Sequence, residues 1–151
     1  MPQKPLPNIT AAELKILKVL WRIGPASVRA VKDELEAAGD ESPAYTTVMT
    51  LMNQLAAKGG LEVDRARQPF IYRTQLRRDQ VLGDRLRQFV RTVFDDQAGE
   101  LVLRLVDEAK LSDDDLKRIE QRIEARERQD AFEKPARGAN SKLRTQAEEG
   151  R

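Results

Sequence analysis

The chain has 151 residues, of which 40% are hydrophobic, 34% charged and only 5% aromatic, and its net charge is +2. This composition is typical of a helix-rich globular protein with one or two small domains. Cysteine and histidine are both absent, which excludes disulfides, thiolate metal sites and every catalytic arrangement that uses histidine.

The sequence also argues against a membrane protein. Its apolar runs stay well below the roughly 18 residues of a membrane span, and its N-terminus lacks the apolar core of a secretory signal. We therefore expect a cytoplasmic protein without membrane insertion, without a cofactor or bound metal, and without enzymatic activity. The net charge is too small to identify a nucleic-acid partner, so the local placement of charge has to decide.

The N-terminal part of the chain predicts two helices. The proline-rich residues 1–8 are expected to form a flexible arm. Thr10 and Glu13 have the spacing of a capping box, so a helix is expected to start after Thr10. Apolar residues at intervals of three and four continue it until Gly24. Ser27 is expected to cap the second helix.

The third predicted helix has an unusual outer face. It begins between Ser42 and Thr46 and ends near Gly59. Lys and Glu, the usual residues of exposed helix positions, are absent from residues 44–57. The face opposite the apolar stripe carries small or hydrogen-bonding residues instead: Thr46, Thr47, Thr50, Asn53 and Ala57.

A basic β-hairpin is expected directly after this helix. Residues 61–65 and 70–73 alternate between apolar and polar, as strands do, and a Gln-Pro turn separates them. Arg65 and Arg67 lie beside the tip of the hairpin.

Three helices followed by a hairpin is the element order of a winged helix-turn-helix, in which the third helix enters the DNA major groove. Short side chains let the helix backbone approach the bases closely while offering donors, acceptors and methyl groups, and basic side chains would contact phosphates. A threonine-rich helix face is, however, more often simply solvated. The candidate DNA-binding residues are Thr46, Thr47, Thr50, Asn53, Lys58, Arg65 and Arg67.

The second half of the chain predicts three amphipathic helices within residues 76–130, which are too short to enclose a good core alone. Residues 131–151 lack an apolar pattern and are expected to be disordered. Ser112 and Asp115 cap the last helix, so the run of acidic residues at 113–115 is assigned to the helix dipole rather than to a metal. The residues expected to pair two copies are Leu82, Leu86, Phe89, Val93, Leu101, Leu105, Leu116, Ile119 and Ile123.

Four segments carry a resemblance that covers about four fifths of the chain: ITAAELKILKVLW, AYTTVMTLMNQLAAKGGL, FIYR and LVLRLVDEAKLSDDDLKRIEQRI. Together, they resemble the penicillinase and methicillin-resistance repressor family, which also includes copper-responsive repressors. The resemblance implies a homodimeric repressor with a winged helix over residues 9–75, a dimerisation domain over residues 76–130 and an inverted-repeat DNA operator. It places Thr46, Thr47 and Thr50 in the recognition helix, and implies a membrane sensor protease as a possible partner.

The chain departs from the family pattern at several positions. Many relatives have Leu-x-Arg-Leu in the third helix, where this chain has Gln54 in place of the arginine. Relatives often have Gly-Arg at the wing tip, which is absent here. Arg104 and Leu105 occupy the position where the staphylococcal-type repressors are cut between Asn and Phe. Because the chain has no cysteine, the mechanism of the copper-responsive branch is excluded.

Three other classes of function compete with a repressor. A winged helix can serve as a protein–protein interaction module, and then the threonine face is incidental. A regulator that senses a small molecule needs a ligand cavity among the helices of the second half. An enzyme is the weakest alternative because no catalytic cluster is present.

Overall fold

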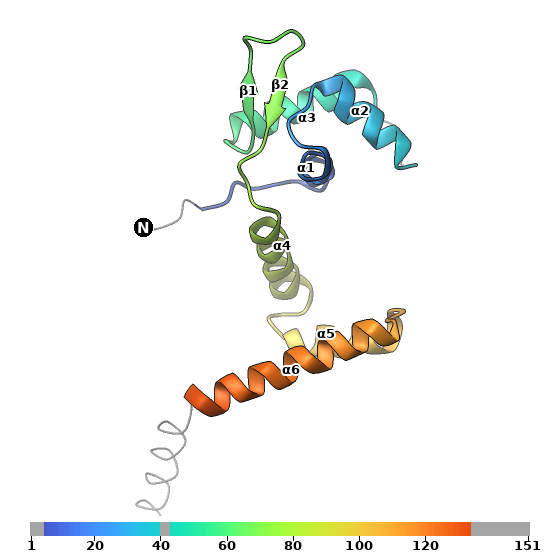
Figure 1. Ribbon diagram of the computed structural model, residues 1–151, viewed down its shortest axis with the longest axis vertical. Coiled ribbons are helices and arrows are strands. Elements are labelled where there is room, and N and C mark those ends of the chain that lie inside the picture. The colour runs from blue at the N-terminus through green and yellow to red at the C-terminus, as the bar shows by residue number, and fades with distance from the viewer. Residues whose placement is uncertain (1–4, 40–42, 134–151) are drawn as a thin grey trace, which may run out of the picture. The chain divides into compact units, whose positions relative to one another are not determined.

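The computed structural model describes residues 5–39 and 43–133. The chain divides into two compact units, Met1–Asp96 and Gln97–Arg151. The first unit contains α1 (Ala11–Ile23), α2 (Val28–Ala37), α3 (Tyr45–Ala57), β1 (Glu62–Asp64), β2 (Ile71–Arg73) and α4 (Arg78–Val93), and the second contains α5 (Ala98–Glu108) and α6 (Asp113–Glu133) (Figure 1). The expected fold class, mostly helical with a small β-wing, is confirmed.

The caps read from the sequence start the first two helices. The Thr10 hydroxyl accepts a hydrogen bond from the Glu13 backbone N–H at 3.2 Å, and the Glu13 carboxylate accepts one from the Thr10 N–H at 3.0 Å. Ser27 accepts from the backbone N–H of Ala30 at 3.2 Å. These bonds satisfy N–H groups that have no partner within the helix, so both helix starts could be located from sequence.

The core of the first unit lies between α1, α2, α3, the wing and the first turn of α4. The indole N–H of Trp21 donates to the Leu76 carbonyl at 2.8 Å, which joins α1 to the segment before α4. The buried apolar residues are Ile9, Ile16, Leu17, Val19, Leu20, Ala26, Val28, Val31, Leu35, Val48, Met52, Leu55, Leu61, Tyr72 and Val81.

The wing is a short antiparallel hairpin in which Val63 pairs with Tyr72. Its regular pairing is limited to three residues on each strand, fewer than the sequence predicted. Backbone hydrogen bonds of 3.0 and 2.8 Å between Ala26 and Tyr72 attach β2 to the segment between α1 and α2. The tip of the hairpin projects beyond the helices (Figure 1).

Helix α4 lies in the first compact unit, which ends at Asp96, whereas the predicted DNA-binding domain ends at residue 75. Val81 is 1% exposed in the core, and the Arg85 guanidinium donates to the Ile9 carbonyl at 2.7 Å. The sequence did not show this packing, because amphipathic periodicity indicates that a helix buries one face but not against which partner.

The described part of the expected arm is also attached. The Lys58 ammonium donates to the carbonyl of Asn8 at 2.9 Å, so residue 8 is held against the end of α3. Residues 1–4 lie outside the described residues.

The second unit differs sharply from the first, because no described residue of α5 or α6 is buried. Ser112 and Asp115 form the expected cap at the start of α6, with bonds of 3.1 and 3.3 Å. Helix α6 continues to Glu133, past the predicted end at residue 130, and the remainder of the predicted tail lies outside the described residues. Over residues 5–39 and 43–133, no helix has the length and apolarity needed to cross a membrane.

Candidate nucleic-acid interface

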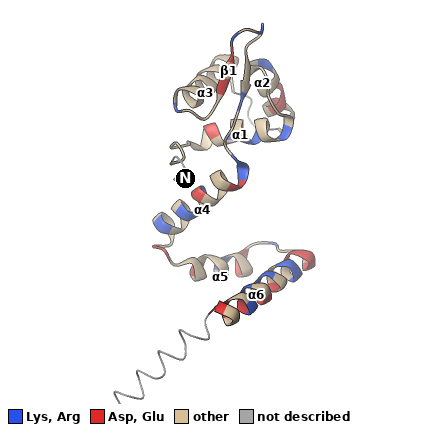
Figure 2. Cartoon of the chain, turned by 60° about the vertical axis from the view of Figure 1, so that its left-hand side comes forward, with Lys and Arg blue, Asp and Glu red and all other residues tan. Residues whose placement is uncertain are grey.

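Helix α3 separates an apolar inner face from an uncharged outer face. Val48, Met52 and Leu55 have no exposed surface and fix the helix against the core. Thr46, Thr47, Thr50 and Asn53, which the sequence predicted as an outer face, are all exposed. The helix contains no acidic or basic residue and is tan along its length in Figure 2, so its outer face offers only neutral hydrogen-bonding groups and methyl groups.

The hydroxyl of Thr50 is oriented by its own helix. It donates to the Thr46 carbonyl at 2.9 Å, so its hydrogen points back along α3. The lone pairs and the methyl group of Thr50 remain available at the surface. Such a side chain can accept a hydrogen bond or contact a thymine methyl group.

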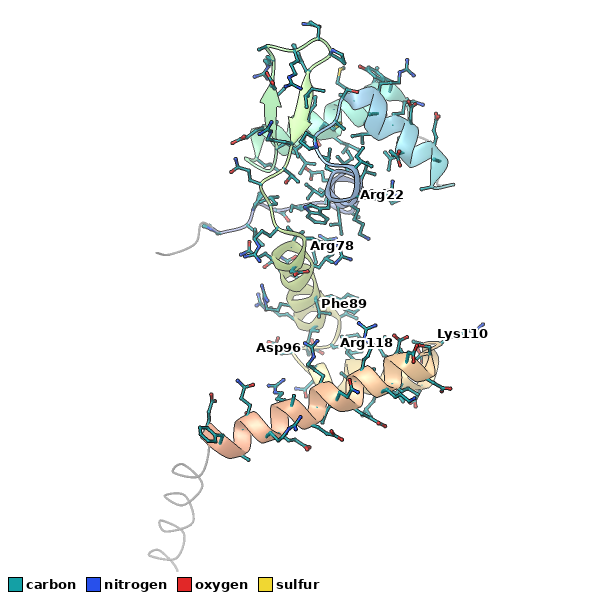
Figure 3. All side chains as sticks on the ribbon, in the orientation of Figure 1. Arg22, Arg78, Phe89, Asp96, Lys110 and Arg118 are labelled. Carbon is teal, nitrogen blue, oxygen red and sulfur yellow. The ribbon has the colours of Figure 1, made fainter. Side chains whose placement is uncertain are left out.

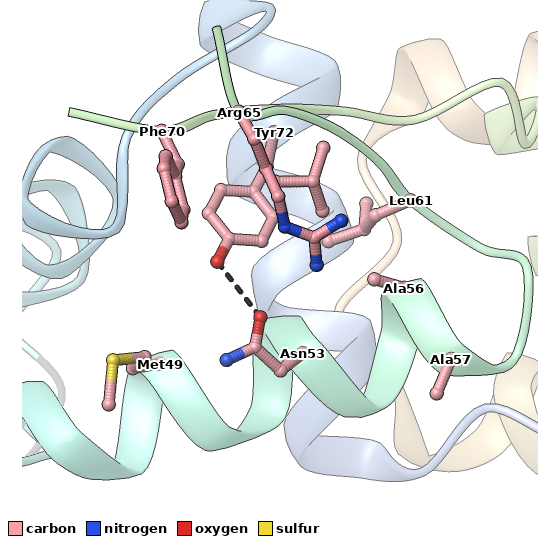
Figure 4. Close-up of a pocket in the computed structure, with 9 residues that line it drawn as sticks. Met49, Asn53, Ala56, Ala57, Leu61, Arg65, Phe70 and Tyr72 are labelled. Atoms are coloured by element: carbon pink, nitrogen blue, oxygen red, sulfur yellow. Dashed lines mark hydrogen bonds between the residues drawn. The ribbon is translucent and has the colours of Figure 1, made fainter. Parts of the chain in front are cut away.

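Tyr72 connects the wing to α3. Its hydroxyl donates to the Asn53 side-chain oxygen at 2.9 Å, although the two residues are 19 positions apart in the chain (Figure 4). Tyr72 is 3% exposed, and burial raises the pKa of its hydroxyl despite the opposing charge of Arg65. The hydroxyl therefore stays protonated at neutral pH and able to donate.

An open cleft of about 500 Å³ lies between α3 and the wing. Arg65 and Asn53 bring polar groups to a wall that is otherwise mainly apolar (Figure 4). The residues that line the cleft are Met49, Asn53, Ala56, Ala57, Leu61, Val63, Arg65, Phe70 and Tyr72.

Lys58 has a structural partner, which the sequence did not predict. Its ammonium lies 2.6 Å from the Glu13 carboxylate, whose side chain has no exposed surface. Burial alone would raise the pKa of the Glu13 carboxyl, but hydrogen bonds from Lys58 and Thr10 outweigh burial and bring the pKa below its usual value. Lys58 thus stabilises a buried carboxylate and ties the end of α3 to α1, in a contact between residues 45 positions apart in the chain.

The two arginines of the wing are more exposed. The Arg67 side chain is 74% exposed, with its Nε 3.4 Å from the Asp64 carboxylate, and Arg65 lies at the cleft. A third basic group was missed by sequence analysis: the guanidinium of Arg29, on α2, lies 5.6 Å from the centre of the Tyr45 ring at the start of α3. A single arginine on an amphipathic helix gives no sequence signal for this placement.

Most of the residues predicted to pair two copies are partly or largely exposed in the single chain. On α4, Leu86 is 54% exposed and Val93 is 57% exposed. The ring of Phe89, which is labelled in Figure 3, packs edge-on against that of Phe94, with the ring centres 5.7 Å apart. On α5 and α6 the corresponding side chains are partly or largely exposed: Leu101, Leu105, Leu116, Ile119 and Ile123.

Residues 9–125 match the family model described as Penicillinase repressor. The chain belongs to the penicillinase repressor family. Among its relatives in this family is the penicillinase repressor of Bacillus licheniformis, 24% identical over 121 residues, which are 80% of this chain and 93% of that one. Another is the methicillin resistance regulatory protein MecI of Staphylococcus aureus, 24% identical over 112 residues, or 74% of this chain and 89% of that one.

One half of this chain is similar to a solved structure. It is the solution structure of monomeric Bacillus licheniformis BlaI in complex with the blaP half-operator, 26% identical, with a TM-score of 0.43. The match covers 50% of this chain and 90% of that one.

Proposed function

We propose that this protein is a cytoplasmic, homodimeric transcriptional repressor that binds an inverted-repeat DNA operator through α3 and the wing of each subunit. The proposal depends chiefly on the outer face of α3, which is exposed, uncharged and built from short side chains. Membership of the penicillinase repressor family and the repressor names of the relatives support it.

In this proposal, the residues of α3 and those of the wing contact different parts of the DNA. Thr46, Thr47 and Thr50 would face base edges in the major groove, where close approach of the helix is needed. Arg65 and Arg67 would contact phosphates, which position the protein without reading sequence. Arg29 is added to this second group, and Lys58 is moved from it to the Glu13 ion pair.

The second unit supports dimerisation. Its helices expose apolar side chains in the single chain, among them Leu105 at 46% and Ile123 at 51%. Large exposed apolar patches mark interaction sites, and a two-fold contact between identical faces is the commonest way to bury such side chains. Two linked reading heads then bind two half-sites with an effective concentration that one head lacks.

A gel-shift assay on the DNA upstream of the protein's own gene tests the proposal. Thr47→Glu places a negative charge against the DNA and is expected to abolish the shift, whereas Lys18→Gln, the same change of charge on an exposed position of α1, is expected to retain it. Equal shifts for Thr47→Glu and the parent protein would remove α3 from its role. Activity that persists without any DNA binding would favour a protein–protein interaction module instead.

A further inference from the structure

The contact between Tyr72 and Asn53 has features of a positioning device. Tyr72 is held at both ends, by the paired backbone bonds to Ala26 and by the 2.9 Å bond from its hydroxyl to Asn53. Asn53, by contrast, is exposed on the outer face of α3. The buried hydroxyl of Tyr72 thus bonds to the oxygen of the exposed Asn53 amide. The amide N–H groups remain able to donate to a molecule at the surface.

The charges around the Asn53 amide also favour the orientation in which its oxygen faces Tyr72. Figure 4 shows the Asn53 oxygen directed at Tyr72 and its nitrogen on the opposite side, toward Met49. Arg65 lines the same cleft as Tyr72, so the electrostatic potential there favours the amide oxygen over its N–H groups. Tyr72 is protonated and able to donate, which again calls for an acceptor.

We propose that Tyr72 is a specificity-determining positioning residue, which fixes the Asn53 amide so that Asn53 reads the operator only as a hydrogen-bond donor. This inference rests on the proposed function, because it assigns the chemistry of one contact in the same interface. Tyr72 itself does not touch the DNA and acts through Asn53.

A donor-only asparagine has a definite preference among bases. In the major groove guanine offers N7 and O6 as acceptors, adenine offers N7 and thymine offers O4, whereas cytosine offers only a donor. To contact cytosine, asparagine must turn its amide oxygen toward the cytosine amino group, and here the bond from Tyr72 holds that oxygen toward the wing. Asn53 is therefore expected to reject cytosine at the base it contacts.

Selection of binding sites from a pool of random double-stranded DNA tests this inference, because the pool contains every candidate operator sequence. The parent protein is compared with Tyr72→Phe, which keeps the ring and removes the donor, and with Asn53→Asp, which keeps an acceptor for Tyr72 and turns a second acceptor outward. Gln54→Glu, the neighbouring exposed amide with the same change of charge, is the matched control. Thermal unfolding of each variant checks that it is folded.

The parent protein is expected to exclude cytosine at one position of each half-site. Tyr72→Phe should admit cytosine at that same position, because the released amide can turn its oxygen toward the cytosine amino group, with a change in preference of about fivefold, as expected for one hydrogen bond. Asn53→Asp should shift the preference there toward cytosine, because a carboxylate accepts from the cytosine amino group. Gln54→Glu should not change the base selected at this position.

The outcomes separate the two proposals. If the parent selects a sequence and Tyr72→Phe selects the same one with unchanged preferences, the inference is overturned while the repressor function stands. The inference is likewise overturned if Asn53→Asp changes no position, and this variant decides the matter if Tyr72→Phe does not fold. If the parent selects no sequence at all, the proposed function itself fails.

Discussion

The two units of this chain use apolar residues in opposite ways. In the first unit, side chains such as Leu17 and Leu55 are completely buried. The Lys58–Glu13 ion pair and the backbone bridge between Ala26 and Tyr72 connect the elements around them. In the second unit, no described residue of α5 or α6 is buried, and Leu103 is 67% exposed. A core that closes on itself fixes the exposed face of α3, whereas the exposed apolar side chains of α5 and α6 are the basis of the proposed dimer.

The largest effect is expected from a charge placed on the open face. Ile119→Asp should turn the proposed dimer into a monomer, because burying an unpaired carboxylate in an apolar contact is strongly unfavourable. Loss of the linked second head should lower operator affinity by roughly 10²–10⁴-fold. Sedimentation and DNA titration measure both effects, and Lys117→Asp, an exposed neighbour, is the control. A variant that remains dimeric would exclude this face as the interface.

The contrast in burial between the two units also predicts how strongly a leucine-to-alanine change lowers the free energy of unfolding in each. Leu55→Ala should destabilise the first unit by about 2–5 kcal/mol, because it removes a fully buried side chain and leaves a cavity. Leu103→Ala, the same change at an exposed position, should alter the free energy of unfolding by less than about 0.5 kcal/mol. Urea unfolding compares them. Equal effects would show that α5 is packed as tightly as the core.

The buried ion pair predicts a dependence of stability on pH. The folded-state pKa of Glu13 is below its usual value of 4.5, so this carboxylate contributes stability that is fully present above about pH 4.5 and is lost as the pH falls through the folded-state pKa. Glu13→Gln should cost about 1–3 kcal/mol at pH 7 and should flatten the pH dependence below pH 4.5.

Unfolding by urea between pH 3 and pH 7 measures this contribution of Glu13. Glu34 is the matched control, because it forms an exposed ion pair with Arg22 at 2.8 Å. Glu34→Gln should cost less than about 1 kcal/mol. A steeper pH dependence in Glu13→Gln than in the parent protein would contradict the assigned role.

The smallest effect concerns the charge of the wing. Arg65→Gln should reduce the slope of log K against log salt concentration by about 0.9, as expected when one phosphate contact is lost. Arg78→Gln, at the exposed first residue of α4, should leave the slope unchanged. Binding isotherms at several salt concentrations provide the slopes, and identical slopes for all three proteins would exclude Arg65 as a phosphate contact.

Local signals in the sequence were sufficient for the helices of the first unit. Thr10 and Ser27 mark helix starts because their hydroxyl groups bond within three residues, and Gly59, with a φ of 84°, marks the end of α3. The start of α3 was placed only within five residues because its N-cap, Ala44, has no side-chain acceptor.

Contacts between distant residues were not predictable in the same way. The sequence placed Lys58 among the phosphate contacts because nothing near it in the chain indicates a partner, yet Glu13 lies 45 residues away. The bond between Tyr72 and Asn53 was missed for the same reason. The contact of Arg85 on α4 with the carbonyl of Ile9 was also missed, because α4 and α5 show the same amphipathic periodicity.

The chain has one tryptophan, and its indole N–H bonds to the carbonyl of Leu76 just before α4. Its ultraviolet emission is therefore a built-in optical probe of the joint where the wing leads into α4. A shift in emission wavelength on adding DNA would report strain reaching that joint, without any attached dye.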